Sequence, residues 1–499
     1  MKFILKYTEN FGNKIPHPFV LFYILSFFIV LFSCLMNFFK INNINPKSGN
    51  IIILKNLFSA EGIIFILEDL IKNFIYFPPL GAIVIFMFGI GLLDKVGIIN
   101  DLMKLIILKS SEKMLNISII LISIIGSVAA DATYLILVPL SGKMFNSLGK
   151  NPLAGAALAY SSAGAGYNAN IFITPTDILL SSISTEASRT VDPFFYVSPI
   201  DNYYFIFIST LLLVIISVLV FEKIIEPHSN FLNVIETKKY KFKSISLKNI
   251  NYLKFIGLFT LLFLTLLIFF IYPDKSYFRN LKGKLIPSPF LDVIIPLLFT
   301  WFFMIGIIYG ILSKKITKCN DIPKIIINSS KDLNYILVLF FSISQFIAYF
   351  KWTSLSEFIA INTSNFILDT QLSSIFLILL FIILVSLLSL FITSGSTQWS
   401  LMAPIFIPTF MFLDFDPAFI QAAYRIGDSV TNTLSPISPY FAITLSFMQK
   451  YKKNIGIGSL ISLVLPMSIW YFISWTILFF IWSFFNLPIG PDVYMKLNN

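Results

Sequence analysis

The stretch 422-AAYRIGDSVTN-432 places an arginine, an aspartate and an asparagine in a chain that is 57% hydrophobic and only 12% charged. Arg425, Asp428 and Asn432 are three and four positions apart, so they share one face of a helix. A charged side chain at membrane depth is costly unless it is paired, and Asp428 is the nearest partner for Arg425. The stretch therefore predicts either an internal ion pair that holds a helix together or a buried binding site.

A similar polar cassette occurs in the first half of the chain. Each half has a Gly-Ser pair, Gly126-Ser127 and Gly395-Ser396, and each serine lies twelve positions before a proline. Each half also has an apolar segment interrupted by Pro, Asn and Asp, near 153–182 and 418–447. Polar and helix-breaking residues are tolerated at membrane depth mainly where they line a cavity or a substrate path. Duplicated, interrupted segments in corresponding halves indicate the binding site of a secondary transporter.

The composition is that of a polytopic membrane protein. The 499 residues include 55 phenylalanines, and the mean hydropathy of +0.84 exceeds what a soluble core requires. The net charge of +11 would suggest nucleic-acid binding in a soluble protein, but the charges lie in short loops, where they orient membrane proteins. Two cysteines and two histidines argue against a disulfide framework and against any metal site other than sodium.

The apolar segments predict an all-α fold with about nine transmembrane helices and two re-entrant hairpins. Seven segments are continuous and about as long as a bilayer crossing, roughly 20 residues; they lie near 18–38, 80–100, 203–225, 252–272, 289–312, 335–351 and 457–485. The two interrupted segments count as broken spans. The regions 115–147 and 371–413 each hold two apolar arms around a Gly-Ser tip. Because the first arm of 115–147 is only about half a crossing long, that region is expected to enter and leave on one side, and the repeat extends this to 371–413.

Lysine-rich loops set the expected orientation. Positively charged loops of membrane proteins usually face the cytoplasm. This rule assigns loops such as 104–113, 238–248 and 450–453 to the cytoplasm, together with the N-terminus. The loop 275–284 is also basic, although this arrangement places it outside. We therefore expect an inverted-topology repeat, in which residues 1–226 hold spans 1 to 4, 227–251 form a cytoplasmic linker and 252–499 hold spans 5 to 9. The segment 39–79 is expected to include an interfacial helix that packs against a partner subunit.

The charged residues of the cassettes suit the binding of an anion and a coupling ion. Arg425 presents five donors in a planar fork that fits a substrate carboxylate, and Asp428 fits the coupling cation or proton. Asp177 follows Thr174-Pro175 as an unpaired acid near the first break. It is interpreted either as a second coupling group or as an N-terminal helix cap.

Other candidates lie at the hairpin tips and at the breaks. Gly126 and Gly395 leave the backbone of the tips accessible to an ion or anion. Trp399 either stacks on an aromatic substrate or packs inside the protein. Further polar ligands are expected from Ser127, Asn170, Ser396 and Asn432, and helix starts or breaks from Pro417, Pro436 and Pro439.

At these residues the chain resembles the p-aminobenzoyl-glutamate transporter (AbgT) family, whose members import an aminobenzoyl-glutamate folate breakdown product or export sulfonamide drugs. The resemblance rests on 422–432 with Pro436 and 439-PYF-441, on 403-APIFIP-408, 456-GIGSL-460 and 487-LPIGP-491, and on 126–139 and 151–177. It implies a homodimer of protomers with nine spans and two opposed hairpins. Carried over by position, it implies that Asp177, Ser396, Trp399, Pro417, Arg425, Asp428 and Pro436 are functionally sensitive. The family often has a small-residue pair at Thr397-Gln398, so the larger Gln398 is expected to alter the size of the substrate.

The predicted function is secondary transport of an aromatic or amino-acid-derived carboxylate, driven by an H+ or Na+ gradient. Substrate contacts are expected from Asn170, Ser396, Trp399, Arg425, Asn432 and Pro436. A sodium-coupled dicarboxylate carrier with similar hairpins and a channel stay open as alternatives. No clustered nucleophile and base and no nucleotide-binding signature accompany the cassettes, so an enzyme, an organic cofactor and an ATP-driven pump are not expected. The resemblance places the chain in the bacterial cytoplasmic membrane.

Overall fold

The computed structural model describes residues 16, 18–39, 42–44, 51–111, 114–129, 131–230, 247–273, 276–279, 289–329, 331–369 and 373–497. Within these residues the chain is largely helical, and its one sheet is the antiparallel pair β1 (Asn42–Ile44) and β2 (Ile51–Ile53). The predicted all-α fold is confirmed. Most of the expected linker, residues 231–246, and most of the basic loop 275–284 lie outside the described residues.

The first half follows the apolar segments, with one bend that the sequence did not indicate. α5 and α6 meet at an angle of 59°, because Gly97 leaves the helix with a φ of +79°, a conformation that favours glycine. The helices of this half are α2 (Pro18–Phe38), α3 (Ala60–Glu68), α4 (Leu70–Ile75), α5 (Pro78–Val96), α6 (Ile98–Lys109), α7 (Leu115–Gly126), the 3-10 turn η2 (Ser127–Ala129), α8 (Asp131–Ser147), α9 (Pro152–Gly166), α10 (Pro175–Ser188), α11 (Tyr203–Val220), the π-helical η3 (Phe221–Ile225) and α12 (Glu226–Asn230).

The second half contains the other hairpin and the other broken span. A bend of 67° separates α17 from α18, a helix that the apolar pattern did not predict. The helices are α13 (Leu247–Ile271), α14 (Pro289–Asp292), α15 (Ile294–Leu312), α16 (Asp321–Ser329), α17 (Lys331–Trp352), α18 (Leu355–Asp369), α19 (Ser374–Ser389), α20 (Gly395–Phe412), α21 (Pro417–Asn432), α22 (Pro439–Gln449) and α23 (Ile457–Phe484).

Several helices have the length and hydropathy of membrane spans. Five described helices meet that standard singly, and the number rises to seven if each bent pair is one span. Adding the two broken spans, α9–α10 and α21–α22, would give the expected nine. That number stays a prediction, together with the side on which each hairpin opens.

Proline begins each half of both broken spans. α9, α10, α21 and α22 all start with proline, which fixes φ at a helical value and lacks the N–H that a first turn leaves unpaired. Side chains of Asn151, Thr174 and Asp416 accept hydrogen bonds from the first turns of α9, α10 and α21. Local sequence therefore determines where each span restarts, as expected for Pro417 and Pro439.

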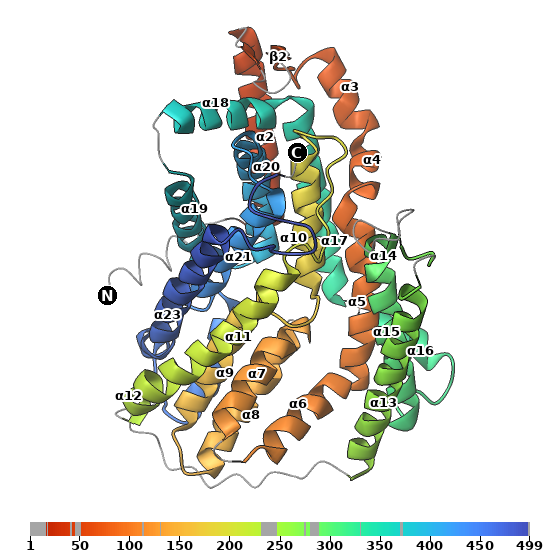
Figure 1. Ribbon diagram of the computed structural model, residues 1–499, viewed down its shortest axis with the longest axis vertical. Coiled ribbons are helices and arrows are strands. Elements are labelled where there is room, and N and C mark those ends of the chain that lie inside the picture. Colours follow the sequence, from red (N-terminus) through yellow and green to blue (C-terminus); the bar gives the residue numbers. More distant parts are fainter. Residues whose placement is uncertain are drawn as a thin grey trace.

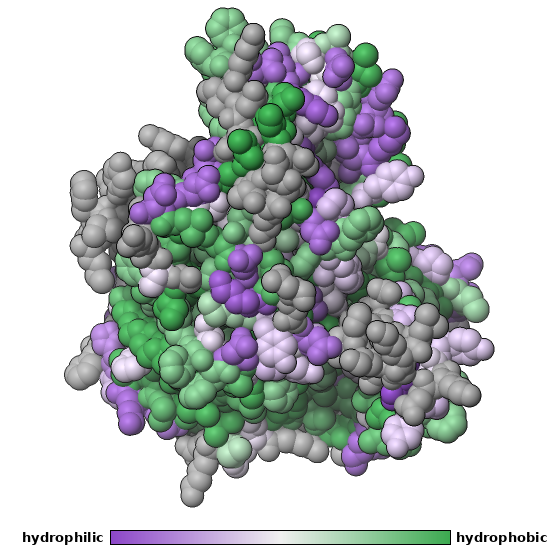
Figure 2. Space-filling view, turned by 45° about the horizontal axis from the view of Figure 1, so that its top comes forward, coloured by the Kyte–Doolittle hydropathy of each residue, from purple (hydrophilic) through white to green (hydrophobic). Residues whose placement is uncertain are grey.

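Two apolar clusters divide the bundle, and α10 lies between them. The larger cluster joins both hairpins and both broken spans with α11, α17 and α23. The smaller one joins α5, α13 and α15, which run side by side in Figure 1, and it includes Ile178 of α10. Leu179 and Leu180, the next two residues, belong to the larger cluster. Hydrophobic side chains also cover much of the outer face shown in Figure 2, as contact with lipid requires.

The hairpins pack crosswise against the broken spans. The second arm of each hairpin contacts the second half of the broken span from the other half of the chain, α20 against α10 and α8 against α22. The rings of Tyr134 and Tyr440 stack with centroids 4.4 Å apart at the second of these contacts. An inverted repeat would produce this exchange of partners, although the repeat boundaries remain predictions.

The C-terminal segment closes over two half-buried acids in loops. Main-chain hydrogen bonds join Asp416 N to Met495 O, Leu497 N to Asp414 O, and Phe205 N to Ile489 O, each 3.0 Å long. A side chain at Gly490 would collide with the backbone of Asp201. Burial in this packing raises the pKa of Asp201 to about 8 and that of Asp416 to about 7.

Raised carboxyl pKa values give this region a defined pH dependence. Because the folded state binds these protons more tightly than the unfolded state, the free energy of unfolding should fall as pH rises from about 4 through about 8. Asp201→Asn and Asp416→Asn keep an acceptor for Ser198 N and Ala418 N, so both variants should flatten the fall. Thermal unfolding in detergent between pH 5 and 8.5 measures this, and an unchanged slope in the double variant would refute it.

Candidate functional site

A buried ion pair joins the two halves of the chain. Nη1 of Arg425 lies 2.6 Å from Oδ1 of Asp177, and the two side chains are only 1% and 7% exposed. Arg425 extends from α21 and Asp177 from the first turn of α10. The expectation that Asp177 is unpaired and that Asp428 neutralises Arg425 is therefore wrong. Sequence proximity favoured Asp428, but the packing of α10 against α21 brings a distant acid closer.

Asp177 also caps its own helix, as one interpretation predicted. Its Oδ2 accepts hydrogen bonds from the backbone N and the hydroxyl of Thr174, at 2.6 and 2.7 Å, while Oγ1 of Thr174 accepts from Asp177 N. One carboxylate oxygen thus serves the cap, and the other serves Arg425. The cap fixes the direction of the carboxylate and explains why an acid stands two residues after Pro175.

The remaining nitrogens of the Arg425 guanidinium are also bound. Nε donates to Oδ1 of Asn202 at 3.1 Å. Because a guanidinium can only donate, the amide of Gln421 is oriented with its oxygen 3.0 Å from Nη2. Arg425 therefore has a partner at each nitrogen, and a solute carboxylate can reach it only by displacing one of them.

Trp399 packs inside the protein in this conformation. Its side chain is fully buried, its ring lies 4.5 Å from that of Tyr424, and its Nε1 donates to Leu180 O at 3.2 Å and Ser184 Oγ at 3.0 Å. With Gln421 oriented as above, its amide nitrogen also donates to Ser184 Oγ. Trp399 thereby ties α20 to α10, and contact with a solute would require these helices to separate.

Asp428 lies against the second hairpin tip. A Cβ at Gly395 would be 2.5 Å from Oδ2 of Asp428, so only glycine allows this approach. Asn168, from the break of the first half, donates to the same oxygen at 2.7 Å. Oδ1 of Asn168 and Oγ of Ser429 are buried and have no hydrogen-bond partner within the described part of the chain. Asn168 thus brings an oxygen atom with unused acceptor capacity beside Asp428, the chemistry that a cation or proton site needs.

The first hairpin tip is bound to the break of its own half. Asn170 donates to Ile124 O at 2.8 Å and to Ser127 Oγ at 2.7 Å. Ser127 in turn donates to Gly166 O, and a Cβ at Gly166 would collide with the backbone of Ile124. Ser127 and Asn170, both expected as polar ligands, therefore lie together, but their donors are used within the protein. Gly126 ends α7 at this tip.

Other predicted residues remain partly accessible at the second tip and break. Ser396, Asn432 and Pro436 are half-buried, whereas Arg425, Asp428 and Trp399 are sealed. Oγ of Ser435 donates to Leu390 O at 2.8 Å, which holds the break against the tip. Gln398 does not line this region: it is fully buried and bonds Val385 O and Ser389 Oγ within its own hairpin. The expectation that Gln398 alters the size of the substrate finds no support in this placement.

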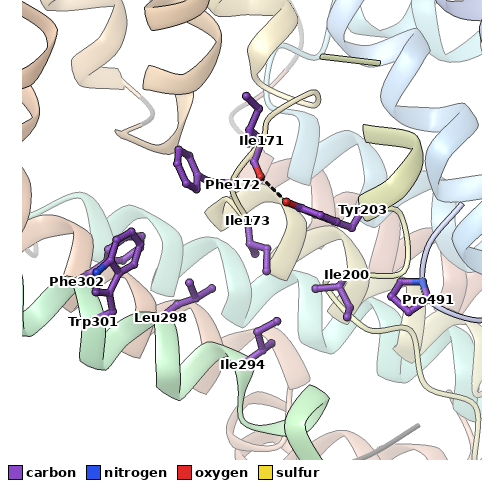
Figure 3. A pocket seen from close by; sticks show the side chains of 10 residues that line it. All are labelled: Ile171, Phe172, Ile173, Ile200, Tyr203, Ile294, Leu298, Trp301, Phe302 and Pro491. Carbon is purple, nitrogen blue, oxygen red and sulfur yellow. Dashed lines mark hydrogen bonds between the residues drawn. The ribbon is translucent and has the colours of Figure 1, made fainter. Parts of the chain in front are cut away.

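An apolar pocket of about 280 Å³ lies beside the first break (Figure 3). Ile171, Phe172 and Ile173 form one wall, and Trp301 and Phe302 of α15 form another. The hydroxyl of Tyr203 donates to Ile171 O at 3.0 Å, the dashed line in Figure 3. The residues that line this pocket carry no charge, so it suits an apolar group and offers nothing to a carboxylate.

Several residues of the site escaped sequence reasoning. Asn202, Gln421, Ser184 and Tyr424 all contact a predicted residue, and the hydroxyl of Tyr424 donates to Gly395 O at 2.5 Å. Gln421 lies four positions before Arg425 on α21, a helical spacing that could have identified it. The loop position of Asn202 carries no periodic signal.

Buried charges paired between interrupted helices, within a helical membrane fold, are typical of secondary transporters. A family model described as "AbgT putative transporter family" matches residues 3–497. The chain therefore belongs to the AbgT family of transporters, as its motifs suggested.

Known relatives agree with this assignment over almost the whole chain. The p-aminobenzoyl-glutamate transport protein of Escherichia coli K12 is 35% identical over 493 residues, 99% of this chain and 97% of that protein. The structure of the Alcanivorax borkumensis YdaH transporter matches with a TM-score of 0.91 at 30% identity, covering 95% of this chain and all of that one. Neisseria gonorrhoeae MtrF, whose structure is described as illuminating a class of antimetabolite efflux pumps, matches with a TM-score of 0.90 at 33% identity over 98% of this chain and 100% of that chain.

Breaking the ion pair should destabilise the protein strongly. Asp177→Ala leaves Arg425 buried without its acid, which is expected to cost about 3 to 5 kcal/mol. Replacing both partners with apolar residues, Asp177→Leu with Arg425→Met, should cost less than the sum of the single changes. Thermal unfolding in detergent measures these changes.

The same helix provides a matched control. Glu186 of α10 pairs with Lys351 at 3.3 Å, but the lysine side chain is 41% exposed. Glu186→Ala should therefore cost less than about 1 kcal/mol. Additive effects of Asp177→Leu and Arg425→Met would contradict a direct energetic coupling.

Proposed function

We propose that the protein is an ion-gradient-driven secondary transporter of aromatic carboxylates of the p-aminobenzoyl-glutamate type, of sulfonamide-type drugs, or of both. The observation that carries the proposal is the Arg425–Asp177 pair, sealed between helices of opposite halves. A fully desolvated arginine is an expensive element for packing alone, since apolar residues of similar volume are often as stabilising. A site that must receive an anion gives it a purpose.

In this mechanism the solute carboxylate replaces Asp177 on Arg425. Both are carboxylates, so the guanidinium exchanges one negatively charged partner for another without a net change in its own charge pairing. The displaced Asp177 then takes up a proton, or turns to a cation, because a buried unpaired carboxylate is costly. Solute binding is thereby linked to movement of a positive charge.

Asp428 provides the second coupling group. Its carboxylate lies beside Gly395 and accepts from Asn168, whose own oxygen lacks a partner within the described residues. A sodium ion or a proton on Asp428 would use this spare acceptor, directly or through water. Occupation of the site would hold the second hairpin tip against the first break, which favours one of the two alternating states.

The rest of the solute is oriented by half-buried groups and by Trp399. Ser396, Asn432 and Asn170 supply hydroxyl and amide contacts beside the tips, and Pro436 shapes the break. Trp399 contacts the aromatic ring once α20 and α10 separate, because its side chain is buried and its Nε1 is bound to Leu180 and Ser184 of α10 before that. The protein works as a homodimer in the bacterial cytoplasmic membrane with its N-terminus in the cytoplasm.

The proposed roles of the acids are tested by uptake into proteoliposomes. Labelled p-aminobenzoyl-glutamate and a labelled sulfonamide are supplied under imposed pH and sodium gradients separately. Asp428→Ala should abolish accumulation driven by one of the two gradients. Transport by Asp428→Ala at the wild-type rate with the same ion dependence would remove Asp428 from coupling.

The same vesicles separate the alternatives. Succinate that competes as well as the aromatic substrate would favour the dicarboxylate carrier. Flux that never exceeds the equilibrium distribution would favour a channel.

The proposed role of Arg425 predicts a loss of carboxylate affinity in Arg425→Lys. A point charge cannot reproduce the bidentate geometry of a guanidinium, so affinity should fall by about tenfold or more. Equilibrium binding of labelled p-aminobenzoyl-glutamate in detergent measures it. Unchanged affinity would exclude Arg425 as the carboxylate ligand.

A further inference from the structure

The geometry points to Asn202 as a positioning residue that sets which edge of Arg425 receives the substrate carboxylate. This inference rests on the proposed role of Arg425. Asn202 is the last residue of the loop before α11, and its side chain is 1% exposed. Among the described residues that are expected to contact the substrate, its side-chain hydrogen bonds reach only Arg425, so it acts through the guanidinium.

Asn202 is held rigidly enough to orient a guanidinium. Its Nδ2 donates to Ala418 O at 2.8 Å, in the first turn of α21, and its Oδ1 accepts from Arg425 Nε at 3.1 Å. The two hydrogen bonds therefore connect residues seven positions apart on α21 through one amide group. Its own backbone oxygen accepts from Ile206 N at 2.9 Å, in the first turn of α11. Asn202 thus joins the start of α11 to the face of α21 that carries Arg425.

The three partners of Arg425 differ in whether an incoming substrate carboxylate displaces them. Asp177 is charged and is the partner that a carboxylate replaces. Asn202 and Gln421 are neutral amides, and a carboxylate gains little by displacing them from a guanidinium that has donors to spare. They keep Nε and one N–H of Nη2 while Asp177 leaves.

Because Asn202 and Gln421 stay bound and Asp177 leaves, only one edge of the Arg425 guanidinium is open to the substrate carboxylate. With Nε bound to Asn202, an incoming carboxylate meets Nη1 and the free N–H of Nη2, the end of the fork that lies toward Asp177. Without Asn202 the guanidinium can rotate and offer the Nε edge instead. Because bidentate pairs depend on geometry, this rotation weakens substrate binding even though the charge remains.

Two substitutions at Asn202 separate positioning from mere packing. Asn202→Ala removes the acceptor for Nε, and the Kd for labelled p-aminobenzoyl-glutamate should rise about tenfold, as expected for a lost hydrogen bond to a charged group. Asn202→Asp keeps the shape and the acceptor but adds a negative charge that competes with the substrate. The Kd should therefore rise further in Asn202→Asp than in Asn202→Ala.

Thermal stability should follow the opposite order. Asn202→Asp loses the donor to Ala418 O but pairs with Arg425, whereas Asn202→Ala loses both bonds, so the Asp variant should unfold at a higher temperature. If Asn202 only supported packing, affinity would follow stability, and the isosteric Asn202→Asp would bind substrate better than Asn202→Ala. That result would overturn the proposal.

Ser209→Ala is the matched control on the same helix. Ser209 of α11 is fully buried and accepts from Trp475 Nε1 at 2.8 Å, with no contact to Arg425. It should lower stability without changing the Kd more than about twofold. An equal rise of the Kd in Ser209→Ala and Asn202→Ala would refute a specific role for Asn202.

Arg425→Lys distinguishes the two proposals. If Arg425→Lys weakens binding but neither Asn202 variant does, the carboxylate role of Arg425 stands and the positioning role of Asn202 fails. If Arg425→Lys leaves the Kd unchanged, the proposed function loses its anion ligand and the role of Asn202 falls with it. Binding is measured at one fixed pH and sodium concentration on folded, monodisperse protein.

Discussion

The ion pair between Arg425 and Asp177 is the constraint to which the rest of the site is fitted. Two charges removed from water need each other and also need hydrogen bonds for their remaining atoms. Thr174 binds the second oxygen of Asp177, and Asn202 and Gln421 bind the other nitrogens of Arg425. The break before α10 makes the capped carboxylate possible, because an uninterrupted helix would have no N-terminal turn at that depth.

The polar residues of the two cassettes fall into two sets with different consequences. One set is sealed, as Arg425, Asp428 and Trp399 are, and it binds α10, α20 and α21 to one another. The other set, which includes Ser396 and Asn432, is half-buried at the second tip and break. A carrier that alternates between two states needs both kinds of residue. In such a carrier, buried groups form the interactions that change between the two states, and accessible groups make the first contact with a solute.

The sequence allowed much of the fold to be predicted, and less of the site. Hydropathy and length located the long helices, and prolines such as Pro175 and Pro417 marked where the broken spans restart, because both signals are local. The partner of Arg425 was missed, since Asp177 lies 248 positions away and only packing brings the two together. Asn202 was missed because an asparagine in a loop has no pattern to reveal it. The burial of Gln398 within its own hairpin was not foreseen, because a position beside a tip does not show which way a side chain points.

The distance along the chain between Asp177 and Arg425 also bears on how the protein is made. Ribosomes add about 5 to 20 residues per second, so Asp177 emerges roughly 12 to 50 s before the arginine that neutralises it. During that interval Asp177 cannot have the partner that it has in the folded protein, because Arg425 has not yet been made. The contact between α10 and α21 that carries this pair can therefore form only late in synthesis.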